Sequence, residues 1–137
     1  MVLTEFLPKG FDFYGQGLVE SIRSDDFGVE QYPFAAAFEL VGDETGMCII
    51  AFSAIPEDFD GPNESMAVEM ANILVSKFSY LLSEASGGLT EVSPPKLFRE
   101  QDTGLAVLLA TVNNPRIYRF SDTYLKVWFV RKEAANA

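Results

Sequence analysis

The chain has 137 residues, 48% of them hydrophobic and 22% charged, which suits one globular domain with a substantial core. Its ten basic and twenty acidic residues leave a net charge of −10, which disfavours nucleic acid and membrane surfaces as partners. With one cysteine and no histidine, an internal disulfide, His-dependent triads and the usual zinc sites are excluded. We therefore expect a single domain over residues 1–137.

The N-terminal segment "MVLTEFLPKGFDFYG" lacks the basic stretch and long apolar run of an export signal. No run in the chain approaches the ~18 apolar residues of a membrane-spanning helix. These observations predict a cytoplasmic protein. Further along, "GLVESIRS" fits two helical turns, but the glycines around it predict only a short or irregular helix.

Residues 32–54 predict a β-hairpin. The apolar runs "YPFAAAFELV" and "GMCIIAFSA" flank "GDETG", which has the composition of a turn. Three consecutive alanines leave a helix possible for the first run, whereas Pro33 and the symmetry of the two runs favour a strand. Cys48 lies inside the second run, so we expect it to be a buried small hydrophobe rather than a nucleophile.

A long helix is predicted from Pro62 or Asn63 to about Glu84. Asn63 can cap its N-terminus, or Pro62 can occupy its first turn, and Glu64 adds negative charge where the helix dipole favours it. The glycine pair at 87–88 is typical of a helix C-terminus, so the helix should end there.

The rest of the chain predicts strands. Residues 89–99 should be extended, because two consecutive prolines forbid helix, and 104–112 should form a short apolar strand. Residues 113–122 connect it to a final strand at 123–132, and 133–137 form a disordered tail. The pattern predicts an α+β fold: an antiparallel β-sheet with the long helix and a shorter N-terminal helix packed on one face.

One thin polar line runs along the otherwise apolar long helix. At 100° per residue its members fall within about 40° of one direction, while apolar side chains cover more than half of the helix surface. We call this line the polar strip; its members are Ser65, Glu69, Asn72, Ser76, Ser79 and Ser83. The pattern predicts a helix wedged between neighbouring elements, with one edge in solvent.

Within the polar strip, Glu69 and Asn72 are three residues apart, so their side chains stand side by side. No lysine lies on the strip to pair with Glu69, because Lys77 falls off the line. Asparagine is also a mediocre helix former, and Gln or Lys would solvate this face at lower cost. The pair is therefore either an ordinary solvated edge or a carboxylate and a carboxamide that reach into a partner's cleft.

Four residues carry a resemblance to a known family. Ser65, Glu69, Asn72 and Pro95 match a signature of Asp or Ser, three residues, Glu, two residues, Asn, twenty-two residues and Pro. The segment resembles the CheC/CheX/FliY family of chemotaxis phosphatases, in particular CheX, over roughly residues 32–132.

The resemblance implies a long antiparallel sheet with two long helices on one face. It also implies an enzyme that removes the phosphoryl group from the aspartate of a phosphorylated CheY-type receiver domain. By position, Asn72 would orient the attacking water and Glu69 would anchor the receiver's active-site lysine, with Ser65 and Pro95 supporting the motif. The chain would need no cofactor or metal of its own, because the receiver carries Mg²⁺. CheX-type proteins form homodimers, so we expect a homodimer.

The chain also departs from the family pattern. In "VEMAN", Val68 and Ala71 stand where family motifs often have glycine, and residues 11–24 contain no second Glu-x-x-Asn. We therefore expect one site per chain and a shortened or displaced first helix. Two other functions remain open: a CheX-like adaptor that binds a partner without turnover, and a dimerisation domain whose polar strip is merely solvated.

Overall fold

A computed structural model of the chain describes residues 7–22, 32–42, 45–99, 104 and 115–131. Within these residues it contains one long helix and ten strands. In chain order the elements are β1 (Gly10–Asp12), β2 (Leu18–Ile22), β3 (Phe34–Gly42), β4 (Gly46–Phe52), β5 (Glu57–Asp58), β6 (Gly61–Pro62), α1 (Glu64–Ser86), β7 (Thr90–Val92), β8 (Lys96–Arg99), β9 (Arg116–Phe120) and β10 (Thr123–Arg131).

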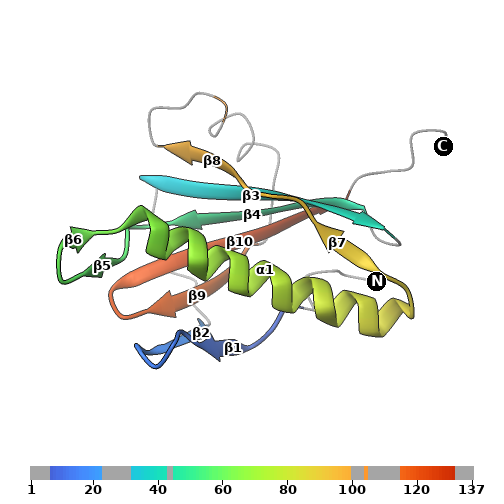
Figure 1. The fold of residues 1–137 in the computed structure, drawn as a ribbon, viewed down its shortest axis with the longest axis horizontal. Coiled ribbons are helices and arrows are strands. Elements are labelled where there is room, and N and C mark those ends of the chain that lie inside the picture. The colour runs from blue at the N-terminus through green and yellow to red at the C-terminus, as the bar shows by residue number, and fades with distance from the viewer. Residues whose placement is uncertain (1–6, 23–31, 43–44, 100–103, 105–114, 132–137) are drawn as a thin grey trace.

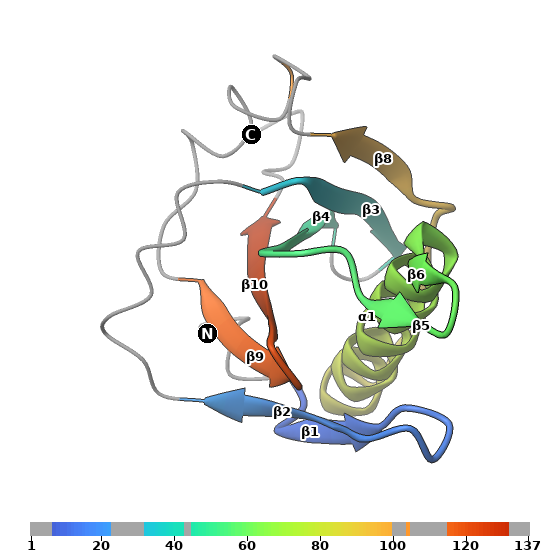
Figure 2. The ribbon, with the colours of Figure 1, turned by 90° about the vertical axis from the view of Figure 1, so that its left-hand side faces the viewer.

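Eight strands form one antiparallel sheet in the order β1-β2-β9-β10-β4-β3-β7, with β8 also paired to β3. β8 and β7 occupy successive stretches of the same edge of β3, opposite Phe34–Ala37 and Leu40–Gly42 respectively. The sheet curls around α1, which lies along its concave side (Figures 1 and 2). β5 and β6 pair with each other just before α1 begins. This arrangement confirms the expected α+β class.

The predicted β3–β4 hairpin is confirmed, and the continuous apolar run Phe34–Phe38 in β3 has a structural cause. Successive side chains of a strand point to opposite faces of the sheet. Phe34, Ala36 and Phe38 belong to the core under α1, whereas Ala35 and Ala37 belong to a second buried cluster that includes Trp128. A strand that is buried on both faces has no polar alternation, which is why "FAAAFELV" also resembled a helix.

The long helix begins and ends where the sequence predicted. Asn63 is the N-cap, and its side-chain oxygen accepts a hydrogen bond from the Met66 N–H at 3.2 Å. Gly87 ends the helix in the left-handed conformation at φ 76°, and its N–H donates to the Ser83 carbonyl at 3.0 Å. Because both ends are satisfied, the helix frays little and can carry side chains at fixed positions.

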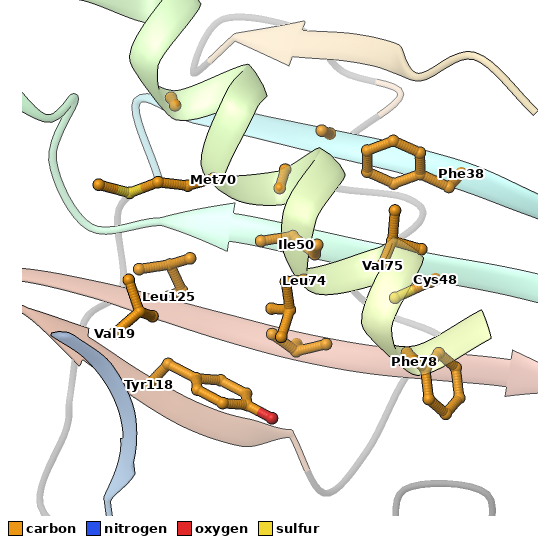
Figure 3. Close-up of a cluster of buried hydrophobic side chains, with 14 of the residues drawn as sticks. Val19, Phe38, Cys48, Ile50, Met70, Leu74, Val75, Phe78, Tyr118 and Leu125 are labelled. Atoms are coloured by element: carbon orange, nitrogen blue, oxygen red, sulfur yellow. The ribbon is translucent and has the colours of Figure 1, made fainter. Parts of the chain in front are cut away.

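The apolar face of α1 fills the hollow of the curled sheet. Figure 3 shows Met70, Leu74 and Phe78 lying over side chains from β4, β9 and β10. Leu74 and Phe78 are fully buried, and the Phe78 ring packs edge-on against Phe129 with 5.5 Å between centroids. Burying such side chains contributes roughly 1.5–3 kcal/mol each, so this face fixes the helix on the sheet.

Two sequence-based predictions for the sheet are wrong. Residues 10–22 form the β1–β2 hairpin, not a short helix, because Phe11, Phe13 and Val19 alternate with exposed positions and the chain turns between the strands. Residues 116–120 form β9, not part of a connector, because their alternating side chains pair between β2 and β10.

Two other predictions fall on residues outside the described ranges. They are the strand over 104–112, apart from Gly104, and the tail at 133–137. Over the part of the chain that is described, no helix is long and apolar enough to cross a membrane.

The sequence predicted that the whole polar strip would face solvent. Its last two members, Ser79 and Ser83, instead contact β7. Ser79 is buried, with 8% of its surface exposed, and its hydroxyl donates to the Thr90 carbonyl at 2.6 Å. One turn further on, the Ser83 hydroxyl accepts from the Thr90 N–H at 3.0 Å. These serines therefore attach α1 to β7, at the edge of the sheet.

We expect Ser79→Ala to lower the free energy of unfolding by about 1–2 kcal/mol, because it leaves a buried carbonyl without its donor. The matched control is Ser76→Ala, which removes the same hydroxyl from an exposed position on the same helix and should change stability by less than about 0.5 kcal/mol. Urea denaturation followed by circular dichroism measures both. Equal effects of the two changes would show that the Ser79–Thr90 bond does not hold the helix.

Candidate functional site

The first four members of the polar strip are the ones that reach solvent. Ser65, Glu69 and Ser76 are exposed, and Asn72 is half-buried. Glu69 and Asn72 are separated by three positions in a capped and firmly packed helix, so their side chains are neighbours. The structure thus brings the two predicted site residues together on one accessible edge.

Glu69 keeps its carboxylate available. Its Oε2 atom accepts a hydrogen bond from the Tyr14 hydroxyl at 3.4 Å, and both side chains are exposed. Among the described residues, no lysine or arginine forms a salt bridge with Glu69. An exposed carboxylate without a cation of its own can bind a cationic group from another molecule.

Asn72 keeps its carboxamide available as well. Over the described ranges, its side chain takes part in no hydrogen bond. A carboxamide carries two N–H donors and an acceptor oxygen, so it can hold a water molecule from either side. A half-buried position limits the number of its rotamers more than a fully exposed one would.

The other two motif residues lie at the edges of this region. Ser65 is exposed in the first turn of α1, next to Glu64, which forms an ion pair with Arg99 of β8. Pro95 is half-buried in the short break between β7 and β8. Both positions fit a supporting role, in which the first turn of the helix and the strand edge are held in place.

Among the described residues, neither the cysteine nor a cluster of metal-binding side chains forms a candidate site. Cys48 is fully buried, and burial raises the pKa of its thiol to about 12, so it is a poor nucleophile. Within those residues, no group of three or more His, Cys, Asp or Glu side chains is arranged to hold a metal ion. The Glu69–Asn72 pair therefore remains the candidate site.

A hollow of about 550 Å³ lies near the N-terminal end of α1. Its lining comes from the β4–β5 connection, the β9–β10 turn, Gln16 and Met66. The ionisable groups in it are carboxylates, Glu57 and Asp122, and no lysine or arginine is present in its lining. This charge pattern disfavours a phosphate group in the hollow.

Sequence reasoning missed one residue of this region, Tyr14. It lies in the turn between β1 and β2, and it reaches Glu69 although 55 positions separate the two residues. The Gly15-Gln16-Gly17 stretch could have predicted this turn, because such glycines are typical of a tight turn between two strands.

Comparison with solved structures identifies the fold. CheX from Vibrio vulnificus superposes with a TM-score of 0.58, at 13% sequence identity, over 85% of this chain and 84% of that one. The chain has the CheX fold. The resemblance carried by the four motif residues is thereby confirmed at the level of the fold. Within the described residues, however, the fold has one helix where the resemblance implied two, and β1–β2 lie in the N-terminal part.

Two further structures are similar at a lower level. A chain of the CheX–CheY–BeF₃–Mg²⁺ complex from Borrelia burgdorferi has a TM-score of 0.49 and 17% identity, over 80% of this chain and 89% of that one. A CheC-like superfamily protein from Shewanella has a TM-score of 0.45 and 14% identity, over 81% and 80%. No family model matches the sequence, and no curated protein has a significant sequence match to it.

We expect the Cys48 thiol to be unreactive in the native CheX fold. Because the sulfur is buried and its pKa is about 12, Ellman's reagent at pH 8 should label no thiol in the folded protein and one per chain in guanidinium chloride. The reaction is followed by absorbance. Rapid labelling of the folded protein would place a reactive nucleophile in this chain and reopen a cysteine-based mechanism.

Proposed function

We propose that this chain is a CheX-like phosphatase that hydrolyses the aspartyl phosphate of a CheY-type receiver domain. The observation that carries the proposal is that an exposed Glu69 and a half-buried Asn72 are neighbours on a capped helix. Within the described residues, Glu69 has no salt bridge and the Asn72 side chain has no hydrogen bond. The solvent-exposed edge of α1 that carries Glu69 supports the proposal, because a second protein could reach it there.

Glu69 is the anchor in this mechanism. It contacts the active-site lysine of the receiver, as the family resemblance implies. The Glu69 carboxylate has no cation from the described part of its own chain, so it forms a new charge-assisted hydrogen bond without breaking a salt bridge. This interaction sets the position of Asn72 one turn further along the helix.

Asn72 orients the attacking water. Its carboxamide oxygen accepts a hydrogen bond from the water and directs the water oxygen toward phosphorus, in line with the bond that breaks. The water oxygen forms the new bond to phosphorus, and the bond between phosphorus and the aspartate oxygen breaks. The products are inorganic phosphate and the free aspartate carboxylate. Such positioning lowers the barrier because the water loses its freedom before the transition state.

The receiver supplies the remaining groups. It carries the phosphorylated aspartate, and we expect it to carry Mg²⁺, which neutralises phosphoryl charge. This division of labour fits a chain without histidine whose cysteine is buried. A cytoplasmic location and a homodimer with one site per chain belong to the same proposal.

Binding without turnover is the second candidate function. The β1–β2 hairpin favours it, because a hairpin lies in the N-terminal region where the resemblance implied a helix. A chain of this kind would hold a receiver as an adaptor. The two functions differ in catalysis alone, so release of phosphate separates them.

We expect Asn72→Ala to lower the acceleration of receiver dephosphorylation by roughly 100-fold, while binding changes little, because the water loses its orienting group. A CheY-type receiver phosphorylated with acetyl phosphate is the substrate, and released phosphate is measured. Ser76→Ala, one turn along the same exposed edge, is the matched control and should retain full activity. Full activity of Asn72→Ala would remove Asn72 from the mechanism, and no acceleration by the unmodified protein would favour the adaptor.

We expect Glu69→Lys to weaken binding of a receiver carrying beryllofluoride and Mg²⁺ by at least about tenfold, because a lysine would face the receiver's lysine. Glu84→Lys makes the same charge change at an exposed position on the same helix, far along from Asn72, and should bind normally. Titration calorimetry measures both. Equal weakening by the two changes would indicate a general charge effect and not an anchor at Glu69.

A further inference from the structure

Tyr14 brings a second part of the chain onto the candidate site. It belongs to the turn between β1 and β2, and its hydroxyl donates to Glu69 Oε2 at 3.4 Å. The tyrosine is 66% exposed, so its ring lies on the surface beside the carboxylate. The motif pair and this tyrosine therefore share one surface, although they come from different elements.

The backbone at Tyr14 is held in an uncommon conformation. Its φ is +49°, in the left-handed region that side chains other than glycine rarely adopt. Hydrogen bonds on both sides fix the turn. The Asp12 carboxylate accepts from the Gly15 N–H at 2.8 Å, and backbone bonds join Phe13 to Gln16 and Gly17 at 2.8 Å. Strained conformations of this kind persist where the surroundings determine them, and they cluster at functional sites.

The turn is also anchored to the sheet. Phe13 is buried at 2% exposure and packs edge-on against Phe120 of β9, with 5.8 Å between centroids. The Tyr14 ring lies 5.1 Å from that of Phe13 in a tilted arrangement. Tyr14 is thus an exposed aromatic side chain on a fixed backbone, which is the kind of residue that contributes most to protein interfaces.

We infer that Tyr14 is a positioning residue for Glu69 and a contact for the receiver; this inference rests on the proposed function. The Tyr14 hydroxyl restricts the rotamers of the Glu69 carboxylate by binding Oε2, which leaves Oε1 for the receiver's lysine. A tyrosine suits this task because it is neutral. A lysine or arginine in its place would neutralise the carboxylate and compete with the partner. The exposed ring adds contact area at low cost in side-chain entropy.

The test uses two substitutions of Tyr14. Tyr14→Phe keeps the ring and removes the hydroxyl, and at 3.4 Å the lost bond is a weak one. We expect it to raise KM and the Kd for a beryllofluoride-bound CheY-type receiver by about threefold, with kcat unchanged. Tyr14→Gly removes the ring as well but suits the φ of +49°. This change should keep or raise the Tm while weakening binding by about tenfold or more. If Tyr14 had only a structural role, binding would not weaken while the Tm was kept.

Tyr80 provides the matched control. It is 64% exposed on α1 and lies further along the helix, so Tyr80→Phe and Tyr80→Gly change a similar surface residue away from the pair. Tyr80→Phe should leave both KM and Kd unchanged, and Tyr80→Gly should lower the Tm without weakening binding relative to the folded fraction. A double-mutant cycle with Glu69→Ala completes the design. The effect of Tyr14→Phe should largely disappear in that background, because the hydroxyl acts through the carboxylate.

The outcomes separate this inference from the proposed function. If the unmodified protein binds the receiver but Tyr14→Phe and Tyr14→Gly bind equally well, the role of Tyr14 is overturned and the phosphatase proposal stands. A lowered kcat at unchanged KM, or a full effect in the Glu69→Ala background, would also overturn it. If the unmodified protein neither binds nor dephosphorylates any CheY-type receiver tested, both proposals fail together.

Discussion

The docking of α1 into the curled sheet is the constraint on which the candidate site depends. Met70, Leu74 and Phe78 are buried on the sheet side, and the serines at 79 and 83 attach the same helix to β7. The helix can neither rotate nor slide without exposing this apolar face or breaking these bonds. Packing on the opposite side of the helix therefore fixes the backbone positions of Glu69 and Asn72, and the Tyr14 hydroxyl adds one contact at the Glu69 carboxylate.

The same docking explains why the site is small. The sheet covers the apolar side of the helix, and its edge strand covers Ser79, so Glu69 and Asn72 lie on the part of the polar strip that reaches solvent. A carboxylate and a carboxamide on a firm rod cannot enclose a substrate, and the nearby hollow is lined by carboxylates that disfavour phosphate. In the proposed function, the second protein supplies the enclosure and the charge.

The sequence predicted the elements whose local pattern indicated only one type of secondary structure. The helix bounds followed from Asn63 and the glycines at 87–88, and the β3–β4 hairpin followed from two apolar runs around a turn. Sequence reasoning failed where two signals competed. Phe11, Phe13 and Val19 alternate as in strands, but "LVESI" has equally good helical spacing, and only pairing with β9 decides between them.

The candidate site shows the same limit. The three-residue spacing of Glu69 and Asn72 predicted that their side chains are neighbours, because a helix has a fixed period. The structure places both on one edge. Ser79 lies on the same polar strip, yet it is buried because β7 covers its side of the helix. Helical periodicity cannot predict which neighbouring element covers part of a polar strip. Tyr14 had no periodic relation to the motif at all. Its place beside Glu69 follows from the pairing of β2 with β9, a long-range contact that no local pattern encodes.

The N-terminal hairpin adds a second element to the surface around Glu69. A helix exposes side chains along its length, whereas a hairpin turn projects one or two residues from a fixed point. Here the turn is fixed by the buried Phe13 and by the Asp12 carboxylate, and it projects Tyr14 toward Glu69. The surface around the motif is thus built by two elements that fold together through one sheet. The surroundings of the Glu69 carboxylate therefore depend on the hairpin as well as on the helix that carries the motif.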